Sequence, residues 1–396
     1  MFPTDIVIIA GARTPMARYT GVFSDVSAID LGAHAAKGAV QRSGVDPGEF
    51  DHVVFGNVMQ TSADAIYGAR HVGLKAGLKV ETPALTVNRL CGSGIEAIVQ
   101  AAQRLLLGEA SMVLAGGMEN MTQAPFVIRG ARTGLKLGAG GLEDFLFVSL
   151  TDSYCGMPMA LTAEKLATQA GITRKDADAY ALRSQQAADA AAKAGVFKEE
   201  IVPVEVRQGK KSILVTEDDH RRPETTMETL EKLPPSFQKD GMVTAGNASG
   251  IVDGAAAVVV TRERTAKERG LKPIGRIVSW ATVGVDPNIM GIGPVPSTRK
   301  ALQLAGMKLE QMDRVEVNEA FAAQYLAVEK ELGLQREKTN VNGGAIALGH
   351  PLGASGTRLV ITVLNELRRK GLKYGLATAC IGGGQGIAMI VEALGN

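Results

Sequence analysis

One cysteine, Cys91, lies in the most reactive setting of the chain. It follows a β-like segment at residues 84–87 and precedes a run of helix formers at residues 95–107. In such a strand–turn–helix arrangement the sulfur lies where the unpaired backbone N–H groups of a helix start converge, and these groups favour the nucleophilic thiolate over the thiol. Gly92 and Gly94 carry no Cβ, so a long ligand can come close to the backbone. The segment therefore predicts a cysteine nucleophile.

Three further residues are candidates to assist this sulfur. His350 lies in a turn before a helical stretch, and an imidazole near a thiol supplies the base that a cysteine nucleophile needs. Cys380 ends a strand-like run, where parallel strands line ligand crevices, and a thiol with a pKa near ~8.5 can exchange a proton with a carbon acid. Asn318 also follows a strand and can hold a water or a carbonyl oxygen. The structural alternatives are a surface histidine, a small buried hydrophobe and a helix N-cap, respectively.

The positions of these residues depend on an alternation of strands and helices at both ends of the chain. Strands are predicted at residues 6–10, 53–56, 84–87, 111–115, 254–261, 274–281, 315–317 and 376–380. Helices are predicted at residues 28–43, 64–73, 95–107, 162–194, 298–305, 320–332 and 357–370. Such alternation favours a largely parallel sheet that is covered on both faces. Residues 120–250 differ in texture and are predicted to be an insertion with little sheet of its own, of the kind that carries binding surfaces.

The second half of the chain repeats the first. The order of strand, Gly-rich turn with a reactive residue, helix, strand and Gly cluster occurs around residues 91–117 and returns around residues 342–384. If two similar α/β halves face each other, their turns meet at one site. The repeat therefore predicts that Cys91 is joined there by groups from the second half.

Composition restricts the class of protein. The chain has 396 residues, of which 45% are hydrophobic and 21% charged, which is typical of a globular protein with a large core. The net charge of +2 gives no case for a nucleic-acid partner. Three cysteines without zinc spacing argue for a reducing compartment and against a disulfide framework or a structural metal. Without a secretory signal or an apolar run of roughly 18 residues, a cytoplasmic protein with no membrane span is expected.

Five motifs together resemble those of one family, the thiolases. They are Asn88-Arg89-Leu90-Cys91-Gly92-Ser93-Gly94, Gly246-Asn247-Ala248-Ser249-Gly250, Asn318-Glu319-Ala320-Phe321-Ala322, Gly349-His350-Pro351-Leu352-Gly353 and Cys380-Ile381-Gly382-Gly383-Gly384. The resemblance runs from the first strand to the last. It implies a five-layered α/β/α/β/α fold with two similar halves and a loop domain inserted in the first. The expected N-terminal half is 1–119 with 251–270, the CoA-binding loop domain 120–250, and the C-terminal half 271–396.

The resemblance also implies roles for single residues in a Claisen-type acyl transfer. Cys91 looks like the nucleophile that holds the acyl group, and His350 like the base that activates it. Cys380 looks like the acid/base for the α-carbon of acetyl-CoA. Asn318 looks like the holder of a water that forms one oxyanion hole with His350, and the N–H groups of Cys91 and Gly382 look like the second.

For the substrate, the resemblance places Arg222 and Thr225 at the nucleotide end of CoA and Ser249 at the pantetheine arm. CoA and acyl-CoA are substrates, so no metal or organic cofactor is expected. Members of the family form dimers or tetramers, and a homodimer or homotetramer is expected here. The stretches 62–67, 82–86 and 233–237 look most like the mitochondrial-type 3-ketoacyl-CoA thiolases.

Four alternatives have distinct sequence requirements. Acetoacetyl-CoA-specific biosynthetic thiolases usually carry His-Met ahead of a Thr-Ala-Glu segment, where this chain has Pro158-Met159, and this departure favours broader chain-length acceptance. A decarboxylating ketoacyl synthase pairs its cysteine with two histidines, whereas Asn318 stands at the second such position. A non-catalytic lipid-binding relative should lack a reactive group, and a cysteine hydrolase leaves Cys380 unexplained.

Overall fold

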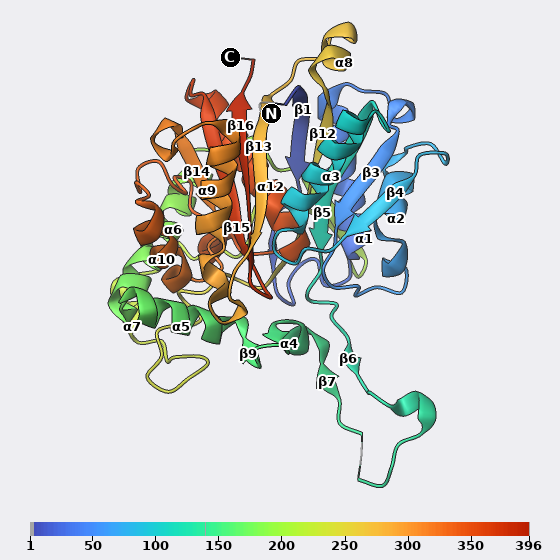
Figure 1. Ribbon diagram of the computed structural model, residues 1–396. Helices are drawn as coiled ribbons and strands as arrows, with labels where there is room; N and C mark the ends of the chain where they lie inside the picture. The colour runs from blue at the N-terminus through green and yellow to red at the C-terminus, as the bar shows by residue number, and fades with distance from the viewer. Residues whose placement is uncertain (1–3, 139, 396) are drawn as a thin grey trace.

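The computed structural model describes residues 4–138 and 140–395, which form two packed α/β halves (Figure 1). In the first half the strands are ordered β4-β3-β5-β12-β1, and in the second β14-β15-β16-β13. Their bounds are β1 Ile6–Arg13, β3 His52–Gly56, β4 Ala84–Val87, β5 Met112–Glu119, β12 Val252–Arg262, β13 Gly275–Gly284, β14 Arg314–Val317, β15 Tyr374–Ile381 and β16 Gln385–Ala393. The two sheets join where β1 pairs with β13 at only two positions, Val7 with Arg276 and Ile8 with Gly275.

The sheet is mixed, so the prediction of a largely parallel sheet is wrong. Strand β3 runs parallel to β4 and β5, and β14 runs parallel to β15, whereas the other strand pairings described for the large sheet are antiparallel. The predicted strand β12 pairs antiparallel with β1 and β5, and β16, which the sequence did not predict, pairs antiparallel with β13 and β15. Gly383 and Gly384, with φ of 76° and 80°, close a tight turn after β15 and send the chain straight back. A turn this short allows only an antiparallel neighbour.

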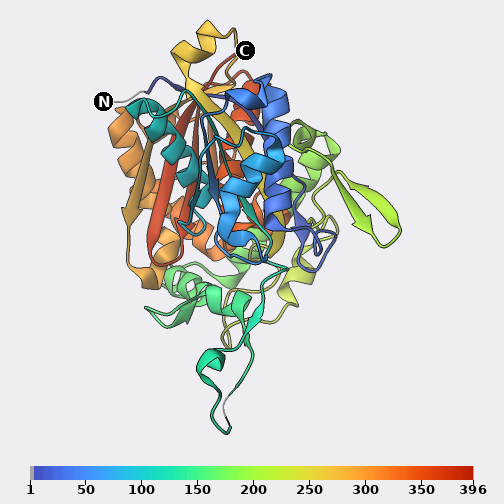
Figure 2. The same ribbon diagram turned by 90° about the vertical axis from the view of Figure 1, so that its right-hand side faces the viewer.

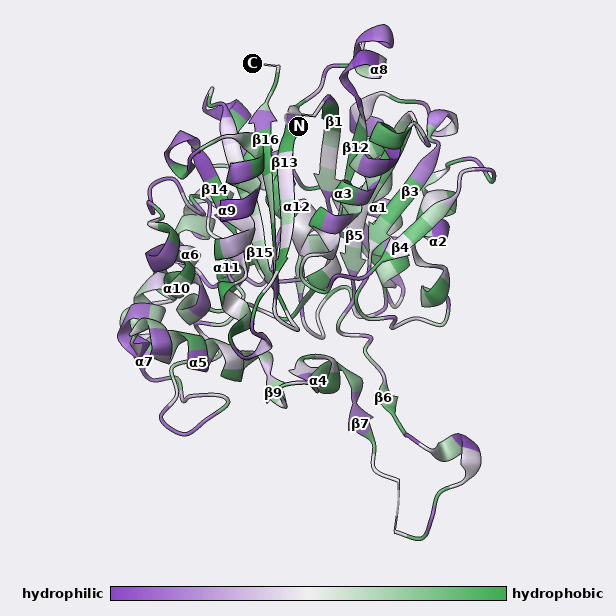
Figure 3. Cartoon of the chain, in the orientation of Figure 1, coloured by the Kyte–Doolittle hydropathy of each residue, from purple (hydrophilic) through white to green (hydrophobic). Residues whose placement is uncertain are grey.

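Helices complete five layers, as the resemblance implied. Helices α3 (Ser93–Leu107) and α12 (Leu352–Arg369) lie between the halves, and their apolar side chains share one core with strands of both. Helices α1 (Ala28–Ser43) and α2 (Gly68–Ala76) cover the outer face of the first half. Helices α9 (Pro294–Ala305) and α10 (Ala322–Leu332) cover that of the second. Figure 3 shows the hydrophobic colour concentrated along the strands and the helices between them.

The predicted internal repeat is confirmed by the strand order. In both halves the first strand is followed by an outer helix, a second strand, another outer helix and then an inner helix, α3 or α12. In the second half the place of β4 is taken by a single bridge of Val315 to Thr339. The two inner helices therefore have equivalent positions, and the turns that precede them meet.

The inserted residues from Asn120 to Gly250 form short elements. They are β6 (Phe126–Val127), β7 (Glu143–Asp144), α4 (Phe145–Ser149), β8 (Thr151–Asp152), β9 (Met157–Pro158), α5 (Met159–Ala170), α6 (Arg174–Lys193), β10 (Val204–Gln208), β11 (Lys211–Val215) and α7 (Met227–Glu231). The single helix predicted over 162–194 is two helices, because Gly171 takes a left-handed conformation after α5. Figure 2 shows the β10–β11 hairpin and the segment between β6 and β7 projecting from the body. Within its described residues, the strands of the insertion are short and form separate two-stranded pairs. The prediction of an insertion with little sheet of its own is therefore confirmed.

The remaining elements are short. They are β2 (Ala17–Arg18), α8 (Glu263–Glu268), α11 (Ala345–Leu348) and the 3₁₀ turns at Pro47–Glu49, Ala65–Tyr67, Ala131–Thr133, Val196–Glu199, Pro287–Ile292 and Leu309–Gln311. Within the described residues, no helix combines the length and the apolar character needed to cross a bilayer.

Helix α12 begins at Leu352, five residues before the predicted start at 357. Gly353 and Gly356 read as turn residues, but they lie inside the helix. A Cβ on Gly356 would come within 2.4 Å of the Ile95 backbone nitrogen, and one on Gly353 within 2.6 Å of the Met118 carbonyl. These glycines allow α12 to approach α3 and β5 closely, which places His350 at a helix start.

Candidate active site

Cys91 lies in a tightly bonded turn at the start of α3. Leu90 has a φ of 46°, and its strained conformation is held by Asn88, whose Oδ1 accepts from the Leu90 N–H at 2.9 Å. Ser93 accepts from the Arg89 N–H at 2.8 Å and donates to the Leu90 carbonyl at 2.7 Å. A Cβ on Gly92 would lie 2.5 Å from the Ile381 side chain, so glycine is needed for β15 to end beside the sulfur. The predicted position of Cys91 is confirmed.

The thiol form of Cys91, however, is favoured over the thiolate at this position. Burial raises the pKa of Cys91 to about 11, although the N–H groups of Gly382 and of Cys91 itself act in the opposite direction. The sulfur packs against an apolar wall, although part of the residue remains accessible. The buried members of that wall are Met59, Met121, Leu146 and Leu352. The N–H groups act in the predicted direction, but the loss of water around the sulfur outweighs them. A base must therefore take the proton from Cys91.

His350 is arranged as such a base. The Ser355 hydroxyl donates to the Pro351 carbonyl at 2.9 Å, so its oxygen is left to accept from His350 Nδ1, 2.5 Å away. This hydrogen-bond network assigns the ring proton to Nδ1 and leaves the lone pair on Nε2. Burial, aided by the positive charge of Arg358, lowers the pKa of His350 to about 3. The imidazole is therefore neutral near pH 7 and can accept a proton at Nε2.

Asn318 and Cys380 lie on adjacent strand ends. The Asn318 N–H donates to the Thr378 carbonyl at 2.9 Å, and its Nδ2 lies 3.2 Å from His350 Nε2. Asn318 Oδ1 is buried and has no partner among the described residues. The alternative of a helix cap is wrong, since Phe321 caps α10. Cys380 is fully buried, and burial together with the nearby Cys91 raises its pKa. The structure thus brings the predicted reactive groups to one place.

The residues predicted to contact CoA lie apart from the reactive groups. Arg222 and Thr225 line a cavity of about 180 Å³ that also takes in His220 and Gly246. Thr225 donates to the Arg222 carbonyl at 2.7 Å, which fixes the turn that carries both residues. Ser249 does not line the cavity, but its N–H donates to the Ala320 carbonyl at 3.0 Å, two residues beyond Asn318. It therefore lies between the cavity and the reactive groups.

Sequence reasoning missed several residues that support the site. Glu119 is fully buried at the end of β5, and its carboxylate accepts from the Met59 N–H at 2.9 Å and the Gly353 N–H at 2.8 Å. Burial raises the pKa of Glu119 to about 7. His220 packs over Gly250, whose carbonyl accepts from the His350 N–H at 2.9 Å. The contacts of Glu119 and His220 join residues far apart in the chain, so no local pattern predicts them. The rarity of histidine, with five in the sequence, is the one signal that could have drawn attention to His220.

This fold and site define a class. The family model described as "Thiolase, N-terminal domain" matches residues 6–264, and that described as "Thiolase, C-terminal domain" matches residues 271–393. The chain belongs to the thiolase family and is an acyltransferase.

Particular relatives are similar along almost the whole length. The mitochondrial 3-ketoacyl-CoA thiolase of Homo sapiens is 54% identical over 389 residues, with 98% of both chains covered. An acetyl-CoA acetyltransferase of Pseudomonas aeruginosa is 49% identical over 387 residues, covering 97% of this chain and 98% of the relative. The crystal structure of the human enzyme in complex with CoA covers 98% of both chains with a TM-score of 0.95.

Proposed function

We propose that this thiolase cleaves 3-ketoacyl-CoA with CoA, and catalyses the reverse Claisen condensation, through an acyl thioester on Cys91. The observation that carries the proposal is the meeting of a protonated thiol, a neutral imidazole whose Nε2 carries no proton and a second buried thiol. Two thiols and a base are the minimum set for an acyl intermediate and a carbon acid in one site. A hydrolase would not use Cys380, and a ketoacyl synthase would have a histidine in place of Asn318.

The first half reaction uses both thiols. His350 Nε2 accepts the Cys91 proton, and the resulting thiolate attacks the 3-keto carbonyl carbon. The bond between C2 and C3 then breaks, its electron pair stays on C2, and Cys380 donates its proton there. Acetyl-CoA leaves, and the shortened acyl group remains on Cys91 while Cys380 is a thiolate and His350 an imidazolium.

The second half reaction restores every group. CoA gives its thiol proton to the Cys380 thiolate and attacks the thioester carbonyl. Cys91 leaves as a thiolate and recovers its proton from the His350 imidazolium. No proton is gained or lost overall, so we propose that the reaction needs neither a metal nor an organic cofactor.

Two sets of donors suit the oxyanions of these steps. The N–H groups of Cys91 and Gly382 contact the Cys91 sulfur and so lie close to the carbon that bonds to it, whose oxygen bears the charge of the tetrahedral intermediate. The unpartnered Asn318 Oδ1 is suited to hold a water beside His350 Nε2 for the enolate oxygen. One such donor typically contributes ~10²–10³ in rate.

Arg222 and Thr225, which line the cavity of about 180 Å³, are proposed to contact the nucleotide end of CoA, and Ser249 is proposed to contact the pantetheine arm. The guanidinium of Arg222 suits a ribose phosphate because it offers a planar fork of donors. The human relative, similar along its whole length, has been crystallised with CoA, which supports a CoA site in this chain.

The test is intact-protein mass spectrometry after mixing with a 3-ketoacyl-CoA and no free CoA. We expect a covalent acyl adduct on the wild type and none on Cys91→Ser. Its yield across a chain-length series separates broad 3-ketoacyl-CoA use from acetoacetyl-CoA specificity. Broad use is favoured by Pro158 ahead of α5 and by the 54% identity to the human enzyme. The absence of an adduct at every length would instead support a non-catalytic lipid-binding relative.

Assembly, location and domain division complete the proposal. We propose a homodimer or homotetramer, which light scattering would distinguish. A cytoplasmic location is also proposed and is open to test by cell fractionation, since the human relative is named mitochondrial. The division into 1–119 with 251–270, 120–250 and 271–396 stays a prediction, to be tested by limited proteolysis.

A further inference from the structure

Arg358 is a buried cation on α12, the helix that follows His350. Its side chain is 1% exposed, and its Nη1 donates to Glu316 Oε2 at 3.1 Å. The other two guanidinium nitrogens, Nε and Nη2, are buried without a partner among the described residues. A buried arginine with a single carboxylate is costly unless its charge or geometry is used.

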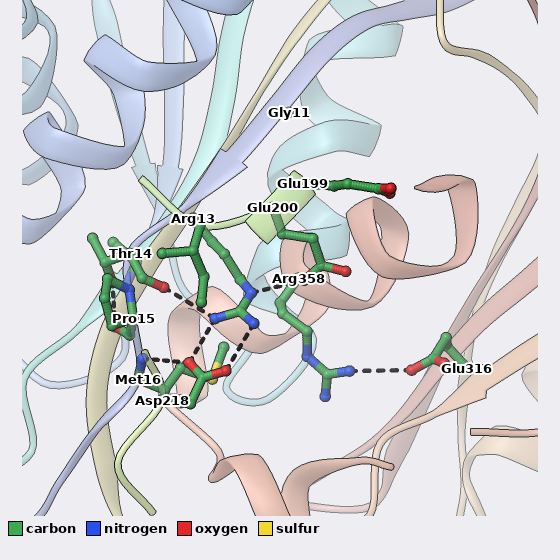
Figure 4. Close-up of polar contacts among 12 residues, drawn as sticks. Gly11, Arg13, Thr14, Pro15, Met16, Glu199, Glu200, Asp218, Glu316 and Arg358 are labelled. Carbon is green, nitrogen blue, oxygen red and sulfur yellow. Dashed lines mark hydrogen bonds and ion pairs between the residues drawn. The ribbon is translucent and has the colours of Figure 1, made fainter. Parts of the chain in front are cut away.

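Arg13 shows what a fully compensated buried arginine looks like in the same protein. It binds Asp218 through two nitrogens, at 2.7 and 2.9 Å, and Glu200 at 2.8 Å. Figure 4 draws Arg13 with its two carboxylates and Arg358 with its single one. Burial raises the pKa of Glu316 to about 8 even beside Arg358, so this carboxylate gives only partial compensation. Arg358 is therefore less completely paired than Arg13, although Glu200, Glu319 and Glu366 also act on Glu316.

The Arg358–Glu316 pair joins the two elements that hold the imidazole. Glu316 lies on β14, two residues before Asn318, whose Nδ2 meets His350 Nε2. Arg358 lies on α12, three residues after Ser355, whose hydroxyl meets His350 Nδ1. The ion pair thus links the strand that contacts one ring nitrogen to the helix that contacts the other.

We propose that Arg358 is a positioning residue for His350, which through Glu316 holds the end of β14 against the first turns of α12 and keeps the imidazole neutral. This role rests on the proposed thiolase mechanism and adds to it a residue that touches no substrate. Its charge acts in the required direction, since Arg358 lowers the pKa of His350.

The other groups around His350 are few. Cys91 in the turn before α3 and Cys380 on β15 have raised pKa values and are neutral thiols near pH 7. His220 packs over Gly250, and burial and Arg222 lower its pKa to about 4. The carboxyl group of Glu119 accepts from the Gly353 N–H at 2.8 Å, and burial raises its pKa to about 7. Arg358 is the charged group that lowers the pKa of His350, so its removal should raise that pKa.

The test follows alkylation of Cys91 by iodoacetamide from about pH 5 to about pH 9, which requires no turnover. A neutral His350 keeps the wild-type rate flat in this range, because proton transfer from Cys91 to the imidazole does not change the net protonation. In Arg358→Met the pKa of the imidazole rises, so the rate should fall at the acid end of this range, and by less than tenfold because burial, the larger cause of the low pKa, remains. Arg358→Lys keeps the charge and should stay flat.

Steady-state kinetics test the positioning role. Glu316→Gln should lower kcat of thiolysis about tenfold, with the KM for CoA within about twofold of wild type and a flat alkylation profile. The matched control is Arg314→Met, which removes a second ion pair between β14 and α12, Arg314 Nε to Glu366 Oε1 at 3.3 Å, remote from His350. It should leave kcat and the alkylation profile unchanged.

Three results would overturn the proposal: a flat profile in Arg358→Met, an equal fall in Arg358→Lys, or an equal loss of kcat in Arg314→Met. If Arg358→Met does not fold, Arg358→Lys and Glu316→Gln decide by the same criteria. A wild type that alkylates with a flat profile but shows no thiolysis would refute the proposed function and not the positioning of His350.

Discussion

Cys91 and His350 occupy the same position in the two halves of the molecule, each two residues before the first residue of an inner helix. Helix α3 begins at Ser93 and α12 at Leu352. The two helix starts are in contact, since Thr357 Oγ1 donates to the Gly94 carbonyl at 3.1 Å. One turn design thus supplies the nucleophile in the first half and the base in the second, and the approach of two helices sets their geometry.

Gly356 should be essential to that approach. A Cβ there would lie 2.4 Å from the Ile95 backbone nitrogen, which cannot move without shifting α3. Gly356→Ala should therefore lower the free energy of unfolding by about 1–3 kcal/mol, as overpacked cores do, and reduce kcat. Denaturant midpoints and steady-state rates measure both. Gly141→Ala is the control, because a Cβ there meets nothing within 4 Å, and an equal loss in that variant would contradict this account.

The raised pKa of Cys91 makes its reactivity dependent on His350. A thiol with a pKa of about 11 is almost wholly protonated at pH 7, so His350→Ala should slow alkylation by iodoacetamide at that pH about 10²-fold or more. The rate in the variant should then rise about tenfold per pH unit as hydroxide removes the proton. A profile in His350→Ala as flat as that of wild type would show that the helix-start N–H groups ionise the sulfur unaided.

The reactive residues could be predicted because each lies in a local pattern of glycines, strand and helix. Their environment could not. The strand–turn–helix pattern predicts the N–H groups around Cys91. The apolar wall around the sulfur comes from separate segments of the chain, and the burial that it causes is the largest influence on the pKa of Cys91. Ser355 and Arg358 read as ordinary helix residues, since nothing local shows what they contact. Strand β16 was missed because the glycines before it suggest that the sheet ends there, whereas they form the hairpin turn between β15 and β16.

Ser355 should govern which nitrogen of His350 carries the proton. Ser355→Ala removes the acceptor at Nδ1, so the ring can turn or take the other tautomer, with the proton on the nitrogen that must act as the base. We expect kcat to fall about 10–100-fold with little change in the KM for CoA. Ser297→Ala is a close control, since Ser297 is also buried and donates to a carbonyl four residues earlier, Gly293, at 2.9 Å. If both variants lost the same activity, the effect of Ser355 would be one of helix packing alone.

Arg13 should be the side chain that attaches the segment of Arg222 and Thr225, the proposed CoA contacts, to the first half. Its contacts with Asp218 and Glu200 are all buried, and Asp218 lies four residues before Arg222. Arg13→Met leaves both carboxylates uncompensated and should cost about 3–5 kcal/mol of unfolding free energy, because breaking a buried ion pair exposes each partner to its full desolvation penalty. Chemical denaturation measures this loss, and calorimetric titration with CoA should show weaker binding at temperatures where the variant is still folded. Arg18→Met is the matched control: the Arg18 side chain is 71% exposed, its Nε lies 4.0 Å from Asp219 Oδ2, and such surface pairs contribute about 0–1 kcal/mol. Equal destabilisation by the two variants would mean that the buried pairing of Arg13 has no special importance. A loss confined to Arg13→Met would identify the ion pairs that hold the segment of Arg222 and Thr225 against β1.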